Sequence, residues 1–102
     1  MRDNLYGLIL SDRASEEFEK DYEWYEGEHE GLGERFAEAI QSKIEKILEN
    51  PYHYKVTRKK QHEAVVEIFP YVILYVVNER AKEILIAAIF HTSRDPKKKF
   101  RK

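Results

Sequence analysis

The pattern of hydrophobic and polar positions differs between the two halves of the chain. In the first half, apolar residues recur every three or four positions, which is the period of an amphipathic helix. The apolar stripe of the first such helix consists of Ala14, Phe18, Tyr22 and Tyr25. The stripe of the second consists of Leu32, Phe36, Ile40, Ile44, Ile47 and Leu48. We therefore expect two consecutive helices, each with one face to bury.

Both expected helices are bounded by residues that start or stop helices. Ser11 or Asp12 can accept a hydrogen bond from the free N–H groups of the first turn. A short glycine-containing link, Gly31–Glu34, leads into the second helix. Asn50-Pro51 ends that helix, because the residue before a proline disfavours the helical conformation. Two amphipathic helices joined so closely form an antiparallel hairpin.

Short runs rich in β-branched and aromatic residues predict strands in the second half. These runs span residues 64–69, 71–77 and 83–90. Because the run 71–77 is almost continuously apolar, we expect it to be the central strand, buried on both faces. Two further strands are expected at residues 5–10 and 54–60, the second at an edge of the sheet.

The order of these elements predicts the fold class. Short links between the later strands indicate an antiparallel meander, which the first strand is expected to join. Helices gathered on one face of an antiparallel sheet are the usual layers for this order. We predict an α+β fold, β-α-α-β-β-β(-β), in which a two-helix antiparallel hairpin packs on one face of a curved antiparallel sheet. The 102 residues suit one domain, with a basic C-terminal tail at about residues 92–102.

Composition excludes several classes of protein. The absence of cysteine rules out a disulfide framework, a thiol nucleophile and thiolate metal sites. The longest apolar run is far short of the ~20 residues that span a bilayer, and no signal peptide is visible. The four histidines lack metal-binding spacing on any one element. We therefore expect a cytoplasmic protein without metal, cofactor or membrane contact.

The net charge of −1 conceals a division along the chain. Residues 1–50 contain 6 lysines and arginines against 14 acids, whereas residues 51–102 contain 12 against 5. Such asymmetry suggests one face that meets acid or phosphate and another that stays solvated. The alternative is that the acids simply coat exposed helix faces.

The first candidate for chemistry lies at the end of the last predicted strand, in the segment His91–Pro96. A histidine titrates near neutrality and can move protons, and an arginine fork such as that of Arg94 grips phosphate in a bidentate way. Together they suit a site that cleaves or binds a phosphodiester. The alternative interpretation is that Asp95 pairs with Arg94 and that His91 caps the strand end.

The second candidate is a basic cluster formed by Lys55, Arg58, Lys59 and Lys60, with His53 and His62 beside it. Cations on a strand interleaved with Tyr52 and Tyr54 can track a nucleic-acid backbone and stack a base. The alternative is edge protection, in which lysines discourage pairing with another molecule.

The order and spacing of several motifs resemble the RelE/ParE toxin superfamily from about residue 8 to residue 100. The matching segments are Leu10–Ala14, Tyr22–Tyr25, Gly31–Phe36, Asn50-Pro51, Phe69–Tyr71 with Tyr75, and His91–Pro96. The most specific of them is F-P-Y followed by H-x-x-R-D-P. The pattern looks closest to the ParE-like branch, whose members are often called plasmid stabilisation proteins.

The resemblance implies two helices on a curved antiparallel sheet and a cognate antitoxin protein encoded beside the toxin. RelE-type members cut messenger RNA in the ribosome, and ParE-type members poison DNA gyrase. Together with the basic cluster, it suggests residues that contact a target or nucleic acid: Lys55, Arg58, Lys59, Lys60, His62, Tyr71, Tyr75 and Phe100. His91 and Arg94 would be catalytic only in a nuclease. Trp24 and the aromatic helix ends suit contact with an antitoxin or a homodimer.

The chain departs from the RelE-like pattern at places where cleavage needs particular groups. RelE-like cleavage uses a tyrosine six positions after the arginine, and Phe100 here has no hydroxyl to exchange a proton. His62-Glu63 occupy a stretch where many relatives carry arginines, and an acid there repels phosphate. A near-neutral charge also favours binding over entry into the ribosome.

We therefore predict a ParE-like toxin that inhibits a DNA topoisomerase such as gyrase by binding and is neutralised by a cognate antitoxin. One alternative is a ribosome-dependent endoribonuclease that uses His91, Arg94 and the cluster Arg58–Lys60. The other is a non-toxic binding module on the same fold.

Overall fold

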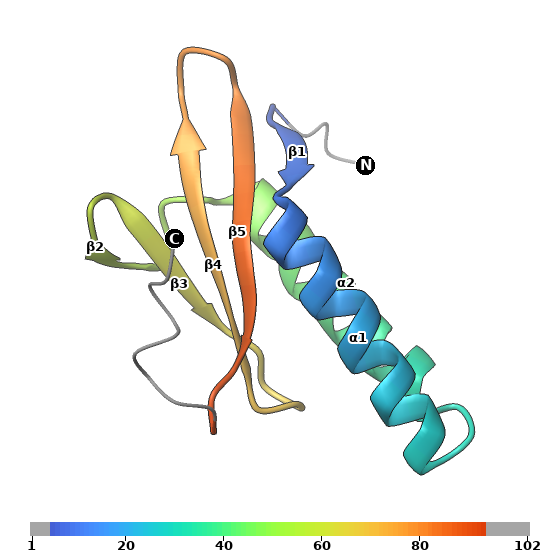
Figure 1. Ribbon diagram of the computed structural model, residues 1–102. Coiled ribbons are helices and arrows are strands. Elements are labelled where there is room, and N and C mark those ends of the chain that lie inside the picture. The colour runs from blue at the N-terminus through green and yellow to red at the C-terminus, as the bar shows by residue number, and fades with distance from the viewer. Residues whose placement is uncertain (1–4, 94–102) are drawn as a thin grey trace.

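The computed structural model describes residues 5–93, in which five strands form one sheet and two helices cover one of its faces (Figure 1). The helices are α1 (Asp12–Glu28) and α2 (Leu32–Glu49). The strands are β1 (Gly7–Leu10), β2 (Lys55–Arg58), β3 (Gln61–Val65), β4 (Tyr71–Asn78) and β5 (Glu83–His91). The predicted order of elements and the α+β class are confirmed.

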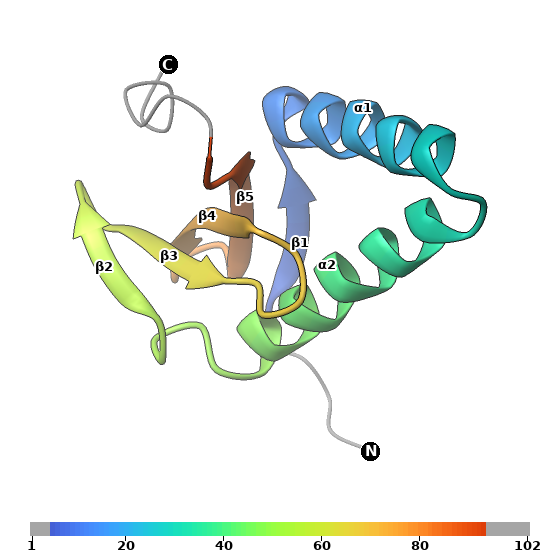
Figure 2. The same ribbon diagram turned by 90° about the horizontal axis from the view of Figure 1, so that it is seen from below.

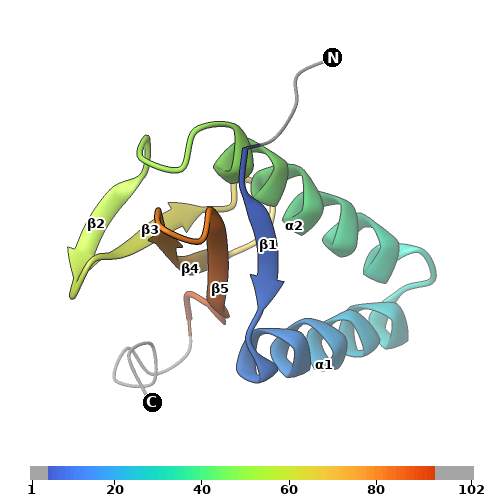
Figure 3. The same cartoon turned by 90° about the horizontal axis from the view of Figure 1, so that it is seen from above.

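The sheet has the strand order β1-β5-β4-β3-β2, so β4 is the central strand. Strands β2 to β5 form the expected antiparallel meander. The first five residues of β4, Tyr71 to Tyr75, are all buried, as the continuous apolar run predicts. The hairpin of β2 and β3 curls away from α1, so β2 is an exposed edge (Figures 2 and 3).

The sheet is mixed rather than wholly antiparallel, because β1 pairs with β5 in parallel. Ser11 alone separates β1 from α1. Because β1 runs parallel to β5, the helix that follows it packs along β5. There the carboxylate of Glu17 accepts a 2.8 Å hydrogen bond from the backbone N–H of Ile89. The partner of β1 lies far away in sequence, so local patterns could not show whether β1 pairs with it in parallel or antiparallel.

The prediction of a strand at residues 64–69 was wrong in its bounds, because β3 begins earlier and ends at Val65. After Val65 the chain turns: Val66 N–H donates to Tyr71 O at 2.9 Å, and Tyr71 N–H donates to Phe69 O at 2.7 Å. Val66 and Phe69 are nevertheless buried. The apolar run therefore continues into a turn that contributes side chains to the core.

The two helices begin with different caps. The Ser11 hydroxyl accepts a 3.0 Å hydrogen bond from Ala14 N–H, as expected for α1. At the start of α2, the carboxylate of Glu26 accepts bonds from Gly31 N–H and Gly33 N–H, each 2.9 Å long. An acid of one helix thus satisfies the free N–H groups of the next.

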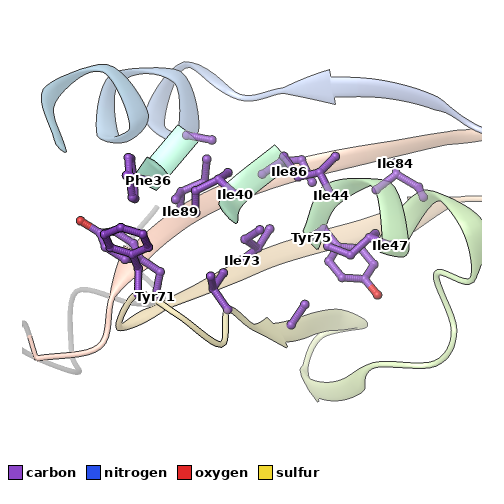
Figure 4. Packing of buried hydrophobic residues seen from close by; sticks show 14 of the residues in the cluster. Phe36, Ile40, Ile44, Ile47, Tyr71, Ile73, Tyr75, Ile84, Ile86 and Ile89 are labelled. Atoms are coloured by element: carbon purple, nitrogen blue, oxygen red, sulfur yellow. The ribbon is translucent and has the colours of Figure 1, made fainter. Parts of the chain in front are cut away.

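The core lies between the helices and the sheet (Figure 4). Its largest fully buried residues are Tyr71, Tyr75, Phe36, Ile40, Ile47, Ile73, Leu74, Ile84, Ile86 and Ile89. At one end, the Phe36 ring packs against Tyr71 at 4.9 Å and Phe69 at 5.6 Å between ring centroids. Tyr75 lies towards the other end of the same core, near Ile47 in Figure 4.

Candidate functional site

The candidate residues lie in two places, at different points along the central strand. On β4, Tyr71 is the partner of His91 of β5, and Tyr75 is the partner of His62 of β3. Four residues of strand correspond to about 13 Å, and β5 and β3 are separated by two strand spacings of about 5 Å each. The predicted residues therefore do not form a single site.

The first place is a pocket of about 340 Å³ between α1 and the end of β5. It is lined by Lys20, Asp21, Trp24, Tyr25, Tyr71, His91 and Ser93. The hydroxyl of Tyr71 donates a 2.7 Å hydrogen bond to Oδ2 of Asp21, whose exposed fraction is 4%. Burial and the neighbouring carboxylate both raise the pKa of Tyr71, so this phenol stays protonated.

His91 is held by its neighbours at the end of β5. Its ring meets the Tyr71 ring edge-on, with 5.0 Å between centroids. Its Nδ1 accepts the backbone N–H of Ser93 at 3.2 Å and lies 2.7 Å from the Ser93 hydroxyl. A neutral His91 ring therefore carries its proton on Nε2. Arg94, the predicted partner of His91, lies outside the described residues, as does Phe100.

The second place is the tight turn between β2 and β3. Lys59 and Lys60 both adopt the left-handed conformation, with φ of 49° and 65°. Hairpins of this kind favour Asn-Gly or similar pairs, because a side chain at positive φ is strained. Arg58 and both lysines are exposed, so the turn presents three consecutive cationic side chains.

Beside this turn lies a pocket of about 680 Å³. It is lined by Tyr52, Val56, Lys60, His62, Val77, Asn78 and Glu79. The imidazole of His62 is 5% exposed and stacks on the Tyr75 ring at 4.9 Å and 10°. Nδ1 of His62 lies 2.8 Å from the carbonyl oxygen of Tyr54 and donates to it.

Glu79 organises the mouth of this second pocket. It accepts hydrogen bonds from Lys82 Nζ and the Tyr52 hydroxyl, each 2.6 Å long, and from the Tyr6 hydroxyl. These donors, Lys82 first, lower the pKa of Glu79 to about 2. The hydrogen bond to Glu79 in turn raises the pKa of Tyr52 to about 12. Glu79 thus joins three segments of the chain while its negative charge is balanced by Lys82.

The remaining predicted residues are distributed between surface and core. Lys55 is exposed and its Nζ lies 3.8 Å from a carboxylate oxygen of Glu63. Tyr71 and Tyr75 are buried, and the Tyr75 hydroxyl donates to Pro51 O at 2.5 Å. In this conformation the two tyrosines support the pockets from inside the core and present no surface to a target.

Sequence reasoning missed Asp21 and Glu79, and expected Trp24 to contact an antitoxin or a second copy of the chain. Trp24 is 60% exposed, which favours a contact surface. Asp21 carried a usable signal, since it falls between Phe18 and Tyr25 on the apolar stripe of α1. A carboxylate at a stripe position needs a buried donor, which Tyr71 supplies. Local sequence gave no sign that Glu79 joins three segments, because Tyr6 and Tyr52, two of its three partners, are distant in sequence.

Residues 5–93 contain no group of three His, Cys, Asp or Glu side chains able to hold a metal ion. Within the same residues, neither helix is long and apolar enough to cross a membrane.

A family profile described as "ParE toxin of type II toxin-antitoxin system, parDE" matches residues 8–96. The match covers most of the chain, and the chain belongs to this family. The predicted membership of the RelE/ParE superfamily, near its ParE branch, is confirmed.

Two solved structures have the same fold. A chain from "Chromosomal ParDE TA system from P. aeruginosa" is 14% identical with a TM-score of 0.76, over 89% of this chain and 100% of that one. A chain from "Crystal structure of the intact E. coli RelBE toxin-antitoxin complex" is 20% identical with a TM-score of 0.66, over 87% and 99%. No curated protein matches the sequence.

Proposed function

We propose that this chain, as the toxin of a type II toxin–antitoxin pair, inhibits a DNA topoisomerase such as gyrase by binding it. A cognate antitoxin neutralises the toxin. Membership of the ParE family supports the toxin role, and the solved relatives come from toxin–antitoxin systems. The ParE-like, rather than RelE-like, character of the sequence supports a topoisomerase as the target.

The separation between His91 and the Lys59-Lys60 turn is the observation that favours binding over cleavage. Cleaving a phosphodiester requires a proton-transfer group and charge-stabilising cations within hydrogen-bond reach of one phosphate. Along the strand direction, His91 and His62 are about 13 Å apart. Across the sheet, β4 lies between the strands that carry them. One phosphate cannot contact both groups, so a nuclease built from His91 and this turn is disfavoured.

We place the antitoxin on the exposed apolar side chains of β1 and on Trp24 of α1. Leu8, Ile9 and Leu10 are each more than a third exposed, and Trp24 is 60% exposed. β1 is an edge strand whose outer side pairs with no other described strand. An extended or helical segment of a partner can cover such an edge by main-chain hydrogen bonds and apolar contact.

Expression in cells and a purified topoisomerase assay test this function together. Expression of the toxin alone is expected to arrest growth, and co-expression of the adjacent small gene is expected to relieve the arrest. Purified protein is expected to inhibit gyrase supercoiling and to stabilise cleaved DNA complexes. Harmless overexpression would favour a non-toxic binding module. Cleavage of translated messages that is lost in His91→Ala or Arg94→Ala would favour the ribonuclease.

A further inference from the structure

We infer that the pocket beside the Lys59-Lys60 turn binds a nucleoside phosphate, either free or as an unpaired nucleotide in a nucleic-acid strand. The base lies in the pocket and the phosphate lies on the turn. This site is distinct from the apolar β1 surface assigned to the antitoxin, and the inference does not depend on the identity of the toxin's target.

The walls of the pocket suit the flat face of a base. Tyr52 is 56% exposed, and its ring meets the His62 ring at 71° with 5.8 Å between centroids. The hydrogen bond from its hydroxyl to Glu79 holds the ring in place. Val56, 57% exposed, and Val77 supply apolar surface beside it. An aromatic ring fixed in advance offers a stacking platform at a low cost in side-chain entropy.

The polar groups of the pocket suit the edge of a base. Because Nδ1 of His62 donates to Tyr54 O, the Nε2 of a neutral ring is a hydrogen-bond acceptor. Nε2 bonds to none of the described residues, and the His62 side chain lines the pocket. Stacking on Tyr75 fixes the direction in which Nε2 points. Asn78 accepts Ala81 N–H at Oδ1, so its amide N–H groups remain available as donors.

The charge at the mouth of the pocket suits phosphate. Lys60 lines the pocket, and Lys59 precedes it in the same turn. Two lysines held at positive φ cost stability, and such strain is commonly retained where the displayed side chains have a function. Glu79 does not oppose an anion strongly, since Lys82 and two phenol hydroxyls already contact its carboxylate. The pocket therefore combines the aromatic, hydrogen-bonding and cationic groups that binding of a nucleotide requires.

The pocket can be tested with adenosine 5′-monophosphate and a short fluorescein-labelled oligodeoxyadenylate strand. Fluorescence anisotropy is expected to show saturable binding of the strand, with competition by the free nucleotide. Tyr52→Ala is expected to weaken binding about tenfold or more through lost stacking, whereas Tyr52→Phe retains the ring and most of the affinity. Lys60→Gln is expected to weaken binding more than the matched control Lys46→Gln, an exposed lysine of α2. Tyr52 and Lys60 are both exposed, so these variants are expected to fold.

Three results would overturn the inference. The first is no saturable binding of either probe. The second is equal weakening by Lys60→Gln and Lys46→Gln with no effect of Tyr52→Ala, which would indicate attraction by charge alone. The third is duplex DNA binding as tightly as the single strand, because paired bases cannot enter the pocket. None of these binding results changes the outcome expected in the growth and supercoiling assays. The nucleotide site and the proposed toxin function can therefore fail independently of each other. If both probes bind, the ratio of their affinities distinguishes a free nucleotide from a strand as the ligand.

Discussion

The hydroxyl of Tyr71 donates a 2.7 Å hydrogen bond to the buried carboxylate of Asp21, across 50 residues of sequence. This bond joins the central strand to α1 at the floor of the pocket that also contains His91. A carboxylate that is 4% exposed depends on such donors, because burial removes most of its hydration. The bond therefore contributes both to the stability of the fold and to the shape of the pocket.

Replacing Tyr71 by Phe removes a donor from Asp21 while it keeps the ring in the core. We expect the free energy of unfolding to fall by about 1–3 kcal/mol, measured by urea denaturation followed by circular dichroism. Tyr22→Phe is the matched control, since the Tyr22 hydroxyl bonds to Glu34 at the exposed surface. Equal stability losses in the two variants would show that burial of the acceptor is unimportant.

Alanine substitutions at Gly33 and Gly27, two glycines of the helical hairpin, are expected to change the stability of the fold in opposite directions. A Cβ on Gly33 would lie 2.9 Å from Tyr22 O and 2.8 Å from a Glu26 oxygen, so the helices would have to move apart. We expect Gly33→Ala to destabilise the fold by about 1–3 kcal/mol.

Gly27→Ala meets nothing within 4 Å and lies in the last turn of α1. It is expected to stabilise the fold by up to about 1 kcal/mol, because alanine loses less backbone entropy than glycine in a helix. Thermal melting of both variants beside the wild type measures the difference. A stabilised Gly33→Ala would contradict the close approach of the two helices.

The lowered pKa of Glu79 predicts that the stability of the fold depends on pH in the acidic range. Its pKa is lowered from the ordinary 4.5 to about 2 by Lys82, Tyr52 and Tyr6. A lowered pKa in the folded state means that the charged carboxylate stabilises the fold above about pH 4.5, and this contribution disappears as pH falls to about 2.

The Tm difference between the wild type and Glu79→Gln is therefore expected to shrink over this pH range. Glu45→Gln is the control, because Glu45 makes no ion pair or side-chain hydrogen bond within residues 5–93. A difference that stays constant down to pH 2 would indicate that the charge of Glu79 is not what stabilises the fold.

Trp24 is the single tryptophan of the chain and lies at the surface. Trp24→Ala is expected to leave the free energy of unfolding nearly unchanged and to weaken binding of the proposed antitoxin about tenfold or more, because exposed aromatic residues often dominate interfaces. In the wild type, Trp24 fluorescence should shift to shorter wavelength when the antitoxin binds. An unshifted spectrum together with full affinity of the variant would place the antitoxin elsewhere.

The sequence by itself determined the helices, the central strand and the family resemblance. The stripes of α1 and α2, the cap at Ser11 and the stop at Asn50-Pro51 depend on neighbours within one or two turns, so they can be recognised locally. The continuous apolar run of β4 requires burial on both faces wherever the strand lies.

The tertiary structure decided which of these elements meet. The parallel pairing of β1 with β5, the end of β3 at Val65 and the cap that Glu26 provides to α2 depend on contacts that local patterns do not encode. The same holds for the two groups of candidate residues, which only the nuclease alternative combined into one site. Pairing of Tyr71 with His91 and of Tyr75 with His62 separates them into two pockets, because positions along a strand become fixed distances only when strand register is known.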